Sequence, residues 1–70
     1  MRKSREFDVV IERDEEGFLV ASVPQLAGCH TQAKSLDVLM KRIREAIGAC
    51  LDAGQKPTGE AFVGVQRVAV

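Results

Sequence analysis

Residues 14–31, which read DEEGFLVASVPQLAGCHT, constrain the fold more than any other stretch because two chain reversals enclose one short apolar segment. An acidic cluster at residues 14–16 precedes Gly17, which takes positive φ without strain, so the chain is expected to reverse there. Pro24 cannot donate to a sheet ladder and ends the strand that follows Gly17. Gly28 then allows a second reversal. The stretch predicts antiparallel strands joined by short turns.

Alternating side chains predict a half-buried strand on each side of the acidic turn. Over residues 6–13, Phe7, Val9 and Ile11 share one side of the chain. Over residues 18–23, one face carries Leu19, Ala21 and Val23 and the other carries Phe18, Val20 and Ser22. Residues 29–33 are short and polar, which suits a third strand at a sheet edge.

A helix is predicted after the third strand. Ser35 is a good N-cap and Gly54 suits the position just beyond the last turn. Between them, apolar residues recur at three- and four-residue steps, namely Leu36, Leu39, Met40, Ile43, Ala46, Ile47 and Cys50. A β-rich run over residues 60–70 predicts a fourth strand. The expected order is β-β-β-α-β, an α+β domain with a mostly antiparallel sheet and one helix packed on one face.

Length and charge limit the classes of function. The 70 residues are expected to form one domain, residues 1–70, with a small core. Ten basic and ten acidic side chains cancel, which argues against a dedicated nucleic-acid binder. The basic segment at residues 1–5 has no apolar anchor and is expected to be a solvated tail. The N-terminus also lacks the apolar part of an export signal, and no apolar run approaches the ~20 residues of a membrane span. We expect a soluble, cytoplasmic protein with reduced cysteines.

The order of elements and the residues they carry resemble the N-terminal domain of HicB-family antitoxins. The resemblance covers residues 7–54 and rests on Gly17, Phe18, Val23, Pro24, Leu26, Gly28, Cys29, Thr31, Ala33 and Ser35, followed in the helix by Arg44, Glu45, Ala46 and Ile47. It implies a truncated ribonuclease H-like fold that binds and inhibits a small mRNA-cleaving toxin of the HicA type. Many members add a C-terminal DNA-binding module. This chain has no room for one, so a stand-alone domain without enzymatic activity or cofactor is expected.

Two chemical alternatives to that interpretation involve side chains that could bind a metal ion. A metal-dependent nuclease remnant would use Asp8 and Glu45, but nothing else in the sequence completes a cluster of carboxylates. Cys29, His30 and Cys50 are potential zinc ligands, yet neighbours on a strand point to opposite faces, so buried unreactive cysteines are favoured and no metal is expected. A basic cluster on the helix, made of Lys41, Arg42 and Arg44, is expected to be a solvated surface.

Self-association is also expected, because a single helix cannot cover both faces of a sheet. Val10, Phe18 and Val20 would otherwise be left in water, so a symmetric dimer or a tetramer is predicted. The predicted interface between copies is the last strand, through Phe62, Val63, Val65, Val68 and Val70. A self-associating structural domain without a toxin partner therefore remains an alternative function.

The surface that would bind a toxin is predicted from two loops. Asp14, Glu15 and Glu16 would compete with RNA phosphates for the basic residues of the toxin, and Pro24 and Leu26 would supply an apolar contact.

Overall fold

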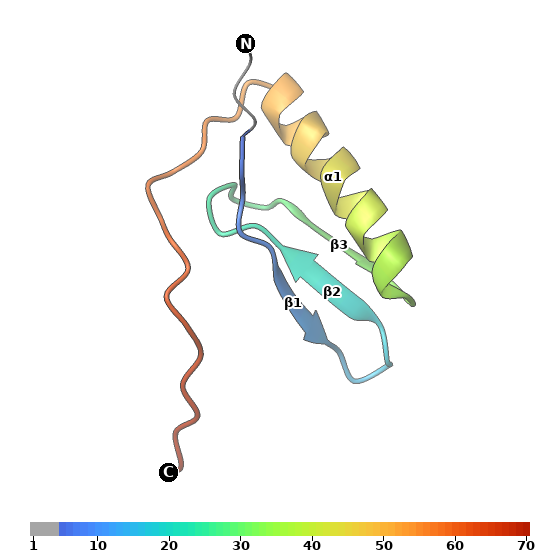
Figure 1. Cartoon of the computed structure of the whole chain (residues 1–70), viewed down its shortest axis with the longest axis vertical. Coiled ribbons are helices and arrows are strands. Elements are labelled where there is room, and N and C mark those ends of the chain that lie inside the picture. The colour runs from blue at the N-terminus through green and yellow to red at the C-terminus, as the bar shows by residue number, and fades with distance from the viewer. Residues whose placement is uncertain (1–4) are drawn as a thin grey trace.

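A computed structural model describes residues 5–70 and shows a three-stranded antiparallel sheet covered on one face by a helix (Figure 1). The strands are β1 (Val10–Arg13), β2 (Leu19–Ser22) and β3 (His30–Ala33), in the spatial order β1-β2-β3, and the helix α1 spans Leu36–Asp52. This arrangement confirms the predicted α+β class. Apart from Arg5, the predicted basic tail lies outside the described residues.

The turn between β1 and β2 is stabilised by a carboxylate and a glycine, as local rules predict. Oδ1 of Asp14 accepts hydrogen bonds from the backbone N–H of Glu16 at 3.0 Å and of Phe18 at 2.9 Å. Gly17 has a φ of 89°, a conformation that strains any residue with a Cβ atom. These contacts reverse the chain within a few residues and set the register in which Arg13 lies opposite Leu19.

The core lies between the helix and one face of the sheet. Ala21, at the centre of β2, is opposite Ile11 on one side and Thr31 on the other, and its side chain is fully buried. The buried apolar residues are Ala21, Val23, Leu26, Cys29, Ala33, Leu39 and Ile43. The predicted alternation along β2 is therefore confirmed, since Ala21 and Val23 face the core together.

The helix begins and ends where its capping residues predict. The Ser35 hydroxyl accepts a hydrogen bond from the N–H of Val38 at 3.4 Å, and Gly54, with a φ of 89°, donates to the carbonyl of Leu51. Leu39 and Ile43 are its buried residues. Helix α1 makes its contacts with β3 and β2 rather than with β1. The helix is thus displaced towards one side of the sheet.

Two predicted strands differ from the structure. The first begins at Val10 instead of residue 6, because β2 ends at Ser22, opposite Val10, and Pro24 follows without an N–H to donate. The fourth strand is wrong for a single chain: in the described residues, 60–70 run extended beside β1 without joining the sheet (Figure 1). Phe62 and Val65 lie across a hollow of about 270 Å³ from residues 8–11, so the backbones do not pair.

Candidate interaction surfaces

The acidic turn presents two free carboxylates rather than three. Glu15 and Glu16 are exposed, whereas Asp14 is half-buried and its Oδ1 holds the turn. On the other side of the turn, Nη1 of Arg13 donates to the carbonyl of Gly17 at 3.4 Å. The hydrogen bonds of Asp14 make the turn a rigid base from which Glu15 and Glu16 point into solvent.

The loop over residues 24–28 is an anchoring element rather than an open contact surface. Leu26 is only 1% exposed, so the prediction that it supplies an apolar contact to a partner is wrong, because the core needs it. Residues that follow α1 also donate hydrogen bonds to this loop. Nε2 of Gln55 donates to the carbonyl of Ala27, and the N–H of Thr58 donates to the carbonyl of Gln25, both at 2.9 Å. The loop therefore ties the chain that follows α1 to the sheet.

The two loops of the predicted toxin-binding surface lie at opposite ends of β2 (Figure 1). The acidic turn precedes Leu19, and Pro24 follows shortly after Ser22. Because an extended strand advances about 3.3 Å per residue, the two loops are separated by the length of β2 and do not form one patch. Of the predicted residues, Glu15 and Glu16 remain together on an exposed surface, and half-buried Pro24 is remote from them.

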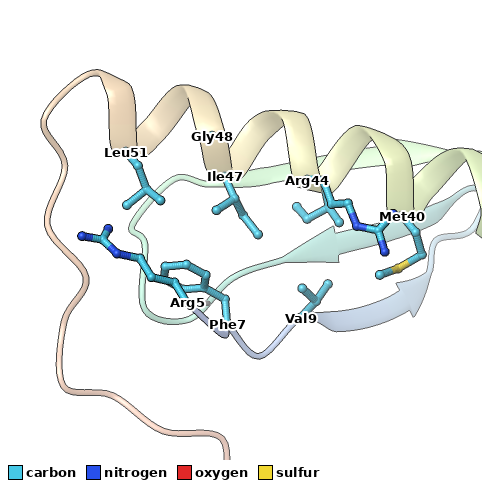
Figure 2. A pocket seen from close by; sticks show the side chains of 9 residues that line it. Arg5, Phe7, Val9, Met40, Arg44, Ile47, Gly48 and Leu51 are labelled. Atoms are coloured by element: carbon cyan, nitrogen blue, oxygen red, sulfur yellow. The ribbon is translucent and has the colours of Figure 1, made fainter. Parts of the chain in front are cut away.

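A groove of about 390 Å³ is the surface that sequence reasoning missed (Figure 2). It opens because α1 covers β2 and β3 and leaves the start of β1 uncovered. Its walls are the helix and the extended residues before β1, and its lining is Arg5, Phe7, Val9, Met40, Ile43, Arg44, Ile47, Gly48 and Leu51. Most of these side chains are apolar. The sequence contains one indication of this groove. The apolar face of the helix is wider than the face that it needs to cover two short strands.

The two carboxylates of the nuclease alternative are not brought together. Asp8 alternates with Phe7 and Val9, which face the groove, so it points away from α1, and its Oδ2 accepts a hydrogen bond from Nε2 of Gln25 at 3.3 Å. Glu45 is exposed on the helix. Within residues 5–70, no group of three His, Cys, Asp or Glu side chains is placed to hold a metal ion.

The two cysteines meet in the core, and His30 lies apart from them. Cys29 is 3% exposed, and the Cys50 thiol on α1 is within hydrogen-bonding reach of it. Burial, followed by the contact with Cys50, raises the pKa of Cys29 from 9.0 to about 11, so the Cys29 thiol is protonated at neutral pH. Neither cysteine is in a disulfide. His30 is exposed. The cysteines behave as small apolar side chains that join the sheet to the helix.

The three residues of the basic cluster on α1 lie in different environments. Nη1 of Arg42 donates to the carbonyl oxygen of Gln32 at 2.8 Å. Arg44 borders the groove, and Lys41 is exposed. On the open face of the sheet, Nζ of Lys34 lies 4.5 Å from the centroid of the Phe18 ring, a cation–π contact that covers part of that face.

These features define a small α+β domain. Within residues 5–70, no helix has the length and apolar character that crossing a membrane requires. No model of a known protein family matches the chain.

Individual relatives nevertheless show which family it belongs to. The chain is 53% identical over 64 residues to a UPF0150 protein of Archaeoglobus fulgidus, a match that covers 91% of this chain and 93% of the relative. It is 44% identical over 66 residues to a UPF0150 protein of Synechocystis, covering 94% and 96%. A third match, to a UPF0150 protein of Thermoplasma acidophilum, is 40% identical over 50 residues and covers 71% and 72%. The chain belongs to the UPF0150 family.

Proposed function

We propose that this UPF0150 protein is a HicB-like antitoxin, or a binding module derived from one, that neutralises a small HicA-type mRNA-cleaving toxin in the cytoplasm by direct contact. The observation that supports this most is the acidic turn, where Glu15 and Glu16 are exposed on a rigid base. The resemblance of residues 7–54 to HicB-type domains supplies the class of partner.

The chemistry of such a complex follows from the charges. A ribonuclease that holds RNA needs basic side chains, and a pair of carboxylates on a rigid turn can occupy the same positions as two phosphates. Glu12 is exposed on β1, close to the turn, and adds a third negative charge at that end of the sheet. The burial of Leu26 removes the apolar part of the contact that the sequence suggested, so charge is the main contribution of this end of the molecule.

The test is the association rate with a purified HicA-type toxin, measured by surface plasmon resonance at low and high salt. Glu15→Lys together with Glu16→Lys should slow association at least about tenfold at low salt and much less at high salt, where charges beyond about 10 Å are screened. The matched control is Glu45→Lys with Asp52→Lys, which changes the net charge equally at exposed sites on α1. Equal rates for the two double variants would exclude the acidic turn as the docking surface.

The self-associating domain is the second candidate. It is favoured by the exposed valines of residues 60–70 and by the apolar groove, which are not explained by the acidic turn. The nuclease alternative has no such support, because Asp8 and Glu45 are separated.

A further inference from the structure

The β1 edge of the sheet is able to accept a strand. The spatial order β1-β2-β3 leaves an outer edge on β1 and another on β3. On β3 the carbonyl of Gln32 is already occupied by Arg42. On β1, the described residues Val10–Arg13 pair with β2 alone, and residues 7–9 continue the extended chain with no strand on either side. An unpaired edge of this kind is a template for another strand.

An apolar groove lies directly beside that edge. Phe7 and Val9 form one wall, and Ile47 and Leu51 on α1 form the other (Figure 2). Gly48 lies on the same wall, and a Cβ atom placed there would have nothing within 4 Å. Glycine in a helix interior is unfavourable relative to alanine, so its presence beside an open groove leaves space for a chain to approach the helix closely.

The chain also carries a segment suited to such a site. Residues 60–70 are extended, and Val63, Val65 and Val68 are 97%, 83% and 76% exposed. In the single chain this segment is not a strand, and Phe62 and Val65 line the same hollow. Pairing as a regular strand would present alternate side chains to opposite faces and would place Val63 and Val65 together on one side. β-branched residues favour β-strands, where their side chains pack against neighbouring strands instead of being exposed to water.

We propose that residues 61–70 of a second copy of this chain pair with the open edge at residues 7–13 and place their valines in the groove. The segment does not fill its own site: Phe62 and Val65 lie across a hollow from residues 8–11, and Val63 is left in solvent. Each copy has one segment that can pair, residues 61–70, and one free edge, residues 7–13. A two-fold pair therefore satisfies both at once and closes without further addition.

The inference stands apart from toxin binding because the two surfaces differ. The groove is lined by the residues before β1 and by side chains of α1 from Met40 to Leu51, whereas the acidic turn follows Arg13 at the other end of β1. A second copy also enlarges a core that holds only seven buried apolar residues in the described part of the chain.

The first experiment measures mass by light scattering after size-exclusion chromatography across micromolar concentrations. The wild-type chain, 7.6 kDa, should elute at twice its own mass. Gly48→Arg places a long side chain in the groove, and Val63→Asp with Val65→Asp puts charges on the exchanged strand. Each change should raise the dissociation constant of the dimer at least about tenfold. The matched control Ala49→Arg places the same side chain on the exposed neighbour of Gly48 and should leave the dimer unchanged. Monomeric wild type, or a dimer that tolerates either groove or strand variant, would overturn the proposal.

The second experiment uses wild-type protein, so it does not depend on whether a variant folds. In a mixture of copies carrying different isotopes, filtered nuclear Overhauser spectra report contacts between chains only. Methyl groups of Val63 and Val65 should show such contacts with Phe7, Val9 and Ile47 of the other copy. Contacts found only within one chain would mean that the segment folds back onto its own β1 and would overturn the exchange. Toxin binding is measured separately, so its failure is distinguishable from this one.

Discussion

Nη1 of Arg42 lies 2.8 Å from the carbonyl oxygen of Gln32, and this bond fastens α1 to the outer strand β3. The contact adds to the burial of Leu39 and Ile43, which packs the helix against β3 and β2. Because α1 is held over β3 and β2, the start of β1 is left open and the groove forms beside it. One side-chain contact thus links the position of the helix to the position of the free edge.

Arg42→Ala should lower the free energy of unfolding by about 0.5–1 kcal/mol, since the bond is charge-assisted but exposed to water. Arg42→Lys should retain part of that energy, because an ammonium reaches the carbonyl with poorer geometry. Urea denaturation measures the difference, with Lys41→Ala as the control at an exposed neighbour. A loss no larger than in the control would mean that the bond adds nothing in solution.

Asp14→Ala should destabilise the fold by about 1–2 kcal/mol, because Oδ1 accepts from two backbone N–H groups that would lose their partner. Asp14→Asn keeps an acceptor oxygen at the same position and should cost clearly less. Thermal unfolding compares both with Glu15→Ala, an exposed residue of the same turn that should change stability by less than about 0.5 kcal/mol. Equal stabilities for the Ala and Asn variants would assign the effect to charge and not to hydrogen bonding.

Two glycines should respond to alanine in opposite directions. Gly48 lies inside α1 with open space around its Cβ position, so Gly48→Ala should stabilise the chain by up to about 1 kcal/mol. Gly17 has a φ of 89°, so Gly17→Ala should destabilise it by about 1 kcal/mol or more. Guanidinium denaturation gives both values. Both are measured at concentrations low enough to keep the chains apart, so contact with a second copy does not enter the comparison. Destabilisation by Gly48→Ala under these conditions would mean that packing within one chain, and not helix propensity, decides stability at this position.

The buried thiol should make stability depend on alkaline pH. Burial first, and the neighbouring Cys50 thiol second, raise the pKa of Cys29 from 9.0 to about 11 in the folded state, so folding favours the protonated thiol. The stabilisation is complete below pH 9.0 and is lost as pH rises to about 11, by at most about 3 kcal/mol. Unfolding measured in reducing buffer between these values should show a steeper fall for wild type than for Cys29→Ala. Parallel curves would show that the thiol does not titrate with folding.

Much of the fold follows from local chemistry that the sequence displays. The turn at Gly17 and the helix limits at Ser35 and Gly54 depend on residues a few positions apart, and all three were predicted correctly. Alternation likewise placed Ala21 and Val23 towards the core. The candidate site was predicted less well: Glu15 and Glu16 are exposed as expected, but Leu26 is an anchor, and Pro24 lies at the far end of β2.

The sequence by itself determined where the chain turns, which segments become strand or helix, and which side of each is apolar, because those properties arise from φ, hydrogen bonding and side-chain period over short spans. Only the tertiary structure decided that α1 leaves β1 uncovered, that Cys29 meets Cys50, and that residues 60–70 stay outside the sheet. These outcomes depend on distances between elements that are far apart in the chain. An apolar segment that stays outside a sheet looks the same in sequence as one that has joined it.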